Sequence, residues 1–285
     1  MDVAAGLTEP QAIALAEWLG DWELIADMSW PLLHTRVLHI RTSDGEFVVK
    51  ASRPDSRPGS TAHHVLREID AHLELSGRLG PAATRLRHSS AALSILVTDY
   101  LPGELVHGSA SEWDPAIYEQ AGRMLRRITE PRRASADYVR DLVARARASA
   151  ERAAGLLDPE QLAELEAVLA TVQPGTVELS FTHGDYQPRN WLDDHGVLRV
   201  IDFGRGGWRH WTSDLVRMRH QQLLGHPELE SAFFAGFGAE LSAEEQAHLR
   251  LEELEQAVST VVWAHAVGDA GFEEQGRGMV ARVLA

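Results

Sequence analysis

Two short polar segments lie close together in the second half of this chain of 285 residues. Residues 183–190 read HGDYQPRN, and residues 202–204, which read DFG, begin twelve positions after Asn190. Glycine and proline make the first segment a loop rather than a helix. Such a loop could aim the carboxylate of Asp185 at a hydroxyl group and the amide of Asn190 at a magnesium ion that Asp202 also binds.

The order of these residues is that of the kinase layout, in which a catalytic-loop aspartate precedes a metal-binding asparagine and a DFG aspartate. Residues 191–201 (WLDDHGVLRVI) predict the hairpin that returns Asp202 to the loop, with its turn at residues 194–196. Because either motif alone recurs by chance, the interpretation depends on whether the other parts of the layout follow in order.

The layout also needs a lysine for the nucleotide phosphates and a glutamate that holds this lysine. Residues 36–42 and 46–52 predict two strands around a Ser-Asp-Gly turn, and Lys50 lies near the end of the second strand. Lys50 is the only lysine in the chain, which fits a site that needs a compact charge rather than a planar guanidinium. Glu68 lies in the helix predicted for residues 61–76.

The segment VTDYLPG (97–103) fits a hinge between two lobes. Backbone groups of Asp99 and Leu101 are the expected partners of an adenine ring. Kinases usually cover the phosphates with a glycine-rich loop between the first two strands, but residues 26–35 (ADMSWPLLHT) contain no glycine. We expect backbone groups around Met28 and Ser29 to approach the nucleotide there instead.

Together, HGDYQPRN, IDFG, the VVK lysine, the REI glutamate and the DYLPGE hinge resemble the aminoglycoside phosphotransferase family from about residue 30 to residue 270. Gly184, in place of the arginine of protein kinases, is a mark of that family. The resemblance implies phosphorylation of a small-molecule hydroxyl with ATP and Mg²⁺. It also implies that Asp185 contacts the acceptor hydroxyl and that Asn190 and Asp202 bind Mg²⁺. Lys50, held by Glu68, would contact the phosphates, and Asp214 would support the loop.

Two arginines near these motifs have two possible roles. Arg189 lies inside the loop and Arg205 follows DFG. Either could stabilise charge on the transferred phosphoryl group as part of the catalytic set, and either could form a structural pair with an acidic neighbour.

The surrounding pattern predicts an α+β, two-lobed, protein-kinase-like fold. A nucleotide-binding lobe with a small β-sheet and one key helix would span residues 1–98, a hinge 99–103, and a larger, mostly helical catalytic and substrate-binding lobe 104–285. In the first lobe we expect a helix over 8–20 and a buried strand over 93–100. In the second we expect two short strand pieces, near 181–182 and 198–202, and helices over 114–129, 136–155, 158–170, 212–224, 241–268 and 271–284.

Composition excludes several classes of protein. The net charge of −15 argues against a nucleic-acid partner and could favour a cationic ligand. The absence of cysteine excludes disulfides, thiol catalysis and cysteine-ligated zinc. Neither a signal peptide nor a membrane-spanning apolar run is evident, so we expect a cytoplasmic protein without a membrane partner, either a monomer or a homodimer.

Other polar and aromatic residues have alternative interpretations. The acidic segment 249–256 could face solvent or line a pocket for a cationic acceptor. Trp208, Trp211, Trp263 and His265 could belong to the core or to the wall of that pocket. His183 is expected to brace the loop, and the pair at 63–64 to be solvated.

The remaining hypotheses about function differ in the acceptor molecule. The spacing after DFG leaves little room for the peptide-docking segment of a protein kinase, so the acceptor should be small. An antibiotic of the aminoglycoside, nucleoside or cyclic-peptide type, modified for resistance or self-protection, is one hypothesis. A metabolite kinase of the choline or sugar type is another. A binding module that has lost the reaction is disfavoured because Lys50, Asp185 and Asp202 are all present.

Overall fold

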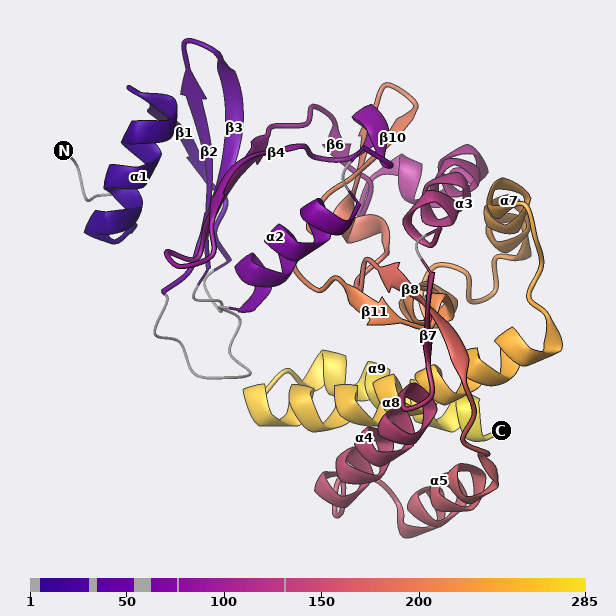
Figure 1. Cartoon of the computed structure of the whole chain (residues 1–285). Coiled ribbons are helices and arrows are strands. Elements are labelled where there is room, and N and C mark those ends of the chain that lie inside the picture. Colours follow the sequence, from indigo (N-terminus) through magenta and orange to yellow (C-terminus); the bar gives the residue numbers. More distant parts are fainter. Residues whose placement is uncertain (1–5, 31–34, 54–62, 76, 131) are drawn as a thin grey trace.

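The structure, a computed structural model, describes residues 6–30, 35–53, 63–75, 77–130 and 132–285 (Figure 1). It has two lobes, as predicted: a smaller one built on an antiparallel sheet and a larger one rich in helices. Part of the predicted glycine-free loop, residues 31–34, and the start of the predicted helix 61–76 lie outside the described residues.

The small lobe contains a five-stranded sheet of order β1-β2-β3-β5-β4. Thr42 pairs with Gly45, which confirms the predicted hairpin turn between the second and third strands. Helix α1 (Glu9–Leu19) packs on one face of the sheet and helix α2 (His63–Glu74) on the other (Figure 1). The strands are β1 (Glu23–Asp27), β2 (Arg36–Thr42), β3 (Gly45–Ala51), β4 (Leu86–Ser90) and β5 (Ile95–Asp99).

The alternation of side chains along β3 determines the direction in which Lys50 points. Phe47, Val49 and Ala51 are buried in the core beneath α1. Since successive side chains of a strand point to opposite faces, Lys50 points to the other face, where α2 lies. Leu96, the partner of Lys50 in the ladder, packs against the buried residues of α2. The pattern of one strand therefore directs the only lysine toward α2 and the larger lobe.

The larger lobe contains more strands than predicted. Two three-stranded sheets, of order β10-β9-β6 and β11-β8-β7, replace the two short strand pieces. The predicted hairpin between β9 and β10 is confirmed, and its turn residues His195 and Gly196 both have positive φ, as a two-residue hairpin turn requires. The strands are β6 (Glu104–Leu105), β7 (Arg132–Ser135), β8 (Val177–Thr182), β9 (Trp191–Asp194), β10 (Val197–Val200) and β11 (Gly207–Arg209).

Most of the predicted helices are present: α3 (Pro115–Ile128), α4 (Tyr138–Arg152), α5 (Pro159–Thr171), α8 (Ala243–Val267) and α9 (Ala270–Leu284). The helix predicted over 212–224 was wrong. A short 3₁₀ turn over Trp211–Asp214 and helix α6 (Val216–Arg219) replace it. The Asp214 side chain accepts from the His183 N–H, and the Gln222 side chain donates to Glu112, so both side chains are held by distant segments. No helix in the described part of the chain is long and apolar enough to span a membrane.

Helix α7 (Pro227–Phe237) was not predicted, although its sequence carries the usual signals. Pro227 occupies the first helical position, and Gly238 ends the helix in the left-handed conformation. Its aromatic residues Phe233, Phe234 and Phe237 enter the main core. In Figure 1, α7 lies beside α3 at the right of the larger lobe, while α4, α5, α8 and α9 form its base.

Candidate active site

Three charged residues from distant parts of the chain meet between the lobes. Lys50 Nζ lies 2.9 and 2.7 Å from the two carboxylate oxygens of Glu68, and 2.8 Å from Asp202 Oδ1. Glu68 is buried at 2% exposure, whereas the Asp202 side chain is half-exposed. Burial lowers the pKa of Lys50, but the carboxylates of Asp202 and Glu68 outweigh burial and raise it, so the ammonium stays charged.

The loop 183–190 is fixed by buried bonds to its neighbours. His183 is fully buried, its Nδ1 accepts from the backbone N–H of Asp185 (3.3 Å), and its Nε2 therefore donates to the Ile201 carbonyl (3.0 Å). The carboxylate of Asp214 accepts from the N–H groups of His183 (2.7 Å) and Gly184 (2.6 Å). His183 and Asp214 thus occupy the bracing positions expected of them.

Gly184 is required by local geometry. Its φ is +80°, and a Cβ built there would lie 2.1 Å from the carbonyl oxygen of Arg205. Any side chain would therefore clash with backbone and also strain the residue. The glycine lets the loop and the segment after DFG pass in direct contact.

Cationic and amide groups surround the carboxylate of Asp185. Arg189 Nη2 lies 2.5 Å and Asn190 Nδ2 3.1 Å from Oδ2, while Arg217 Nε lies 3.2 Å from Oδ1, which also accepts from Gln187. Burial raises the pKa of Asp185, but Arg217, followed by Arg189, outweighs burial and holds the pKa below its usual value. Arg189 therefore pairs with Asp185 itself rather than with a remote acid.

Asn190 and Asp202 are adjacent, as the layout requires. The N–H of Ile201, the residue before Asp202, donates to the Asn190 carbonyl (3.0 Å). The amide nitrogen of Asn190 donates to the Asp185 carbonyl (2.8 Å), so its amide oxygen is the atom left for a metal. Asp202 has a φ of +65°, an uncommon conformation of the kind that concentrates at functional sites.

The other residues expected at the nucleotide lie outside this cluster. At the hinge, the Tyr100 N–H donates to the Glu46 carbonyl (3.0 Å) and Arg87 pairs with the Asp99 side chain (2.5 Å). Leu101 and Asp99 border a cavity of about 970 Å³, whose lining does not include Lys50. Ser29 donates through its N–H to Asp27 (2.9 Å) and accepts at Oγ from the Val37 N–H (2.9 Å), so its bonds are local.

A cavity of about 780 Å³, which we call the catalytic-loop cleft, adjoins Gly184 and is bordered by Arg205. Glu252, Glu255 and Gln256 line it, so part of the segment 249–256 forms a pocket wall. Its other lining residues are Trp30, His64, Arg67, Arg133, Ser135, Tyr138, Asp141, Arg145, Leu179, Trp208, Arg209, Ser213, Arg217, Ser259 and Trp263.

Of the aromatic and histidine residues with two possible locations, some line the pocket and others do not. Trp208 and Trp263 line the cleft. Trp211 belongs to the core, where it stacks on Phe237, and His265 pairs with Glu273 3.1 Å away. The pair at 63–64 was expected to be solvated, but His63 and His64 are both half-buried, and His64 lines the cleft.

Sequence reasoning missed the residues that approach the loop from outside it. Arg217 is three residues beyond Asp214, and its contact with Asp185 depends on how α6 meets the loop. Arg209 donates to Thr182 Oγ1 (2.9 Å) and to the Arg205 carbonyl (3.1 Å), which ties β11 to β8. No local motif marks either residue.

A two-lobed fold in which a lysine, a helix glutamate and a DFG aspartate meet beside an HxDxxxxN loop defines the class of kinase-like phosphotransferases. Within that class, the sequence matches the Phosphotransferase enzyme family over residues 33–266, and the chain belongs to this family. The predicted resemblance, fold class and enzyme class, a phosphotransferase, are thereby confirmed.

Solved structures share the fold at low identity. The apoenzyme of the macrolide 2'-phosphotransferase MphH from Brachybacterium faecium is 17% identical, with 94% of this chain and 96% of that one covered and a TM-score of 0.65. The GDP and kanamycin complex of APH(2")-IIia is 14% identical, with 97% and 98% covered and a TM-score of 0.68. Spectinomycin phosphotransferase APH(9)-Ia, in complex with ADP and spectinomycin, is 11% identical, with 95% and 96% covered and a TM-score of 0.63. No curated protein matches the chain.

Proposed function

We propose that this protein transfers the γ-phosphoryl group of ATP to a hydroxyl of a small molecule, with Mg²⁺ as cofactor. The observation that carries the proposal is the meeting of Lys50, Glu68 and Asp202 at 2.7–2.9 Å, beside a loop that holds Asp185 and Asn190. Each of these groups has a role in phosphoryl transfer.

The residues present fit a magnesium ion. Asp202 and the amide oxygen of Asn190 offer hard oxygen ligands, and Mg²⁺ commonly takes one or two protein carboxylates together with phosphate oxygens and water. No group of three or more His, Cys, Asp or Glu residues suited to a metal occurs among the described residues, so a closed protein cage is not the arrangement here. Bound Mg²⁺ would neutralise phosphate charge.

Asp185 then orients the acceptor. Its depressed pKa keeps the carboxylate ionised near neutral pH, so it accepts a hydrogen bond from the hydroxyl. The hydroxyl oxygen bonds to the γ-phosphorus as the bond to the β–γ bridging oxygen breaks, ADP leaves with that electron pair, and the hydroxyl proton passes by way of Asp185 to solvent. Because the transition state is loose, positioning by Asp185 matters more than its strength as a base.

The remaining assignments follow from the sequence motifs. Lys50, oriented by Glu68, would hold the nucleotide phosphates, and the backbone at Asp99 and Leu101 would meet the adenine. Arg205, which makes no ion pair with any described residue, is free to approach the transferred phosphoryl group. An antibiotic acceptor is supported by the ligands named for the structural relatives, and a cytoplasmic location remains a prediction.

Nucleotide titration tests the proposal. The wild-type protein should bind ATP more tightly with Mg²⁺ than with EDTA and should release ADP with a suitable hydroxyl acceptor. Asp202→Asn should remove the Mg²⁺-dependent part of the affinity, whereas Asp137→Asn, an exposed residue paired with Arg140, should not. Unchanged Mg²⁺-dependent affinity in Asp202→Asn would contradict the proposal.

A further inference from the structure

The charge of the catalytic-loop cleft is opposite to that of the chain. The sequence has 42 acidic residues against 27 lysines and arginines, yet six arginines line the cleft against three acidic residues. One of the three, Asp141, pairs with Arg140, which does not line the cleft. The local excess of positive charge is therefore not a consequence of composition.

Five of these six arginines have no carboxylate partner among the described residues. Only Arg217 forms an ion pair, with Asp185. Arg133 lies over the Trp208 ring, 4.8 Å from its centroid, and Arg209 donates to uncharged oxygens. The others without a carboxylate are Arg67, Arg145 and Arg205.

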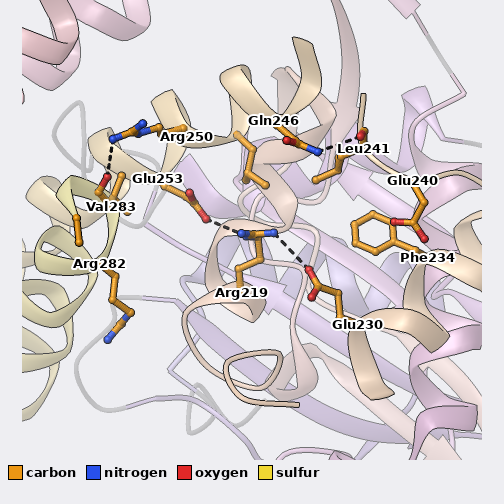
Figure 2. Close-up of a pocket in the computed structure, with 12 residues that line it drawn as sticks. Arg219, Glu230, Phe234, Glu240, Leu241, Gln246, Arg250, Glu253, Arg282 and Val283 are labelled. Carbon is orange, nitrogen blue, oxygen red and sulfur yellow. Dashed lines mark hydrogen bonds and ion pairs between the residues drawn. The ribbon is translucent and has the colours of Figure 1, made fainter. Parts of the chain in front are cut away.

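A second cavity is lined by three arginines, of which one pairs with carboxylates. The C-terminal pocket, of about 660 Å³, lies between α7, α8 and α9 (Figure 2). There Arg219 contacts both Glu253 (3.1 Å) and Glu230 (3.3 Å), and Arg250 donates to the Val283 carbonyl (3.1 Å). Arg250 and Arg282, which donates to His220 Nδ1 (3.2 Å), have no carboxylate partner among the described residues. The cleft differs because five such open arginines line one cavity.

The open arginines extend beyond the nucleotide site. Arg133 on β7 and Arg145 on α4 belong to the larger lobe and share a wall with Glu252 and Glu255, away from Lys50. Neither glutamate forms an ion pair with an arginine among the described residues. Burial raises the pKa of both and brings that of Glu252 to about 7, although the charges of Arg209 and Arg145 act in the opposite direction. Burial also lowers the pKa of Arg67, and repulsion from Arg209 and Arg205 lowers it further, as expected for cations that lack a counter-charge.

From this arrangement we infer that the acceptor is an anion: a hydroxyl compound with a carboxylate or phosphate group that the arginines of β7, α4 and β11 bind. The inference rests on the proposed function and names its substrate class. Guanidinium groups bind both anions through paired hydrogen bonds. The exposed indoles of Trp30 and Trp263, with Trp208, add flat apolar surface for a ring. The inference therefore disfavours polycations, including the kanamycin named for one structural relative, and leaves antibiotics that carry an anionic group.

Four probes that share one ring test the inference: glucose, glucuronate, glucose 6-phosphate and glucosamine, with kanamycin as a polycation. Each is titrated calorimetrically at low ionic strength into enzyme saturated with Mg–ADP, so that an anion cannot use the nucleotide site. We expect glucuronate or glucose 6-phosphate to bind about tenfold more tightly than glucose, and glucosamine and kanamycin to bind no better than glucose. The two anions distinguish a carboxylate from a phosphate preference.

Two variants of one helix locate the effect. Arg145→Gln should reduce the preference for the anion by at least about threefold. Arg147→Gln, which removes the same charge from the side of α4 that pairs with Glu166, should leave it unchanged. Equal binding of all five probes, tighter binding of glucosamine or kanamycin, or an anion preference that Arg145→Gln does not reduce would overturn the inference. Persistence of Mg–ATP binding in that case would show that only the acceptor class is wrong, whereas its loss would count against the proposed function.

Discussion

Helices α6 and α8 each border both cavities, and side chains one or two positions apart on them have different partners. On α8, Glu252 lines the catalytic-loop cleft and Glu253 lines the C-terminal pocket. Glu252 accepts a hydrogen bond from the Tyr138 hydroxyl, whereas Glu253 contacts Arg219 and, at 3.4 Å, His220. On α6, Arg217 reaches Asp185, and Arg219 reaches Glu230 and Glu253.

The comparison shows that residue type does not distinguish the two cavities. Both contain arginines and glutamates, but in the C-terminal pocket Arg219 forms ion pairs with Glu230 and Glu253, as the dashed contacts of Figure 2 show. In the cleft they are held apart, so the charges remain available to a ligand. Charge left open at a cost in repulsion and desolvation is a sign of function, whereas closed ion pairs mainly fix packing.

The largest difference is expected at Asp185. Asp185→Asn keeps the shape of the side chain but removes the charge that holds the acceptor hydroxyl. Turnover should fall by about 10² to 10⁴, while Mg–ATP affinity changes little. Steady-state ADP release and nucleotide titration measure the two effects. Turnover at the wild-type level would show that the loop has no catalytic role.

Glu252→Gln should show how much the burial of this carboxyl group in the cleft reduces the stability of the folded protein. Burial raises the pKa of Glu252 to about 7 from the usual 4.5, so the folded protein binds this proton more tightly than the unfolded chain. The free energy of unfolding of the wild type therefore declines as the pH rises from about 4.5 to 7. The variant lacks this decline and should gain, relative to wild type, about 3 kcal/mol between those pH values.

Denaturant unfolding at several pH values between 4.5 and 8 measures that gain. Glu253→Gln, the next residue on the same helix, is the matched control. A difference between Glu252→Gln and wild type that stays constant over this pH range would show that Glu252 is ionised throughout, and the contrast between the two glutamates would then disappear.

Arg217→Gln should show whether Arg217 acts through Asp185 or by direct contact with the substrate. Loss of this cation should raise the pKa of Asp185, for which Arg217 is the largest stabilising charge, and reduce kcat/KM by about tenfold. The acidic limb of the pH–rate profile should move to higher pH. Arg219→Gln, two residues along α6, should leave the profile in place. A lower rate without a shifted profile would mean that Arg217 acts on the substrate rather than through Asp185.

The smallest effect is expected in the C-terminal pocket. Glu253→Gln breaks the contact with Arg219, whose side chain is 38% exposed and keeps Glu230 as a partner. The variant should lose about 1 kcal/mol of stability and no activity. Thermal unfolding and ADP release measure the two quantities. A clear loss of activity would show that the two cavities are coupled through α8.

The parts of the site that were predictable lie in short, continuous segments. The two hairpins follow from Ser-Asp-Gly and Asp-His-Gly turns, which allow the positive φ that such turns need. The expected partners Lys50, Glu68 and Asp202 do meet, because each belongs to or follows an element whose pattern is clear. Helix α7 could have been found from Pro227 and Gly238, whereas the break in 212–224 could not, because helical periodicity continues through it.

By itself, the sequence determined the order of the catalytic motifs, the turns that bring them together and the direction in which Lys50 points, since these depend on local backbone chemistry and on the alternation of a strand. Only the tertiary structure decided which charges are paired. Arg217 and Arg219, like Glu252 and Glu253, differ in sequence position by one or two residues, and the packing of α6 and α8 sends them into different cavities. Charge pairing depends on distances between segments that are far apart in the chain. These distances cannot be deduced from the composition, which is acidic here.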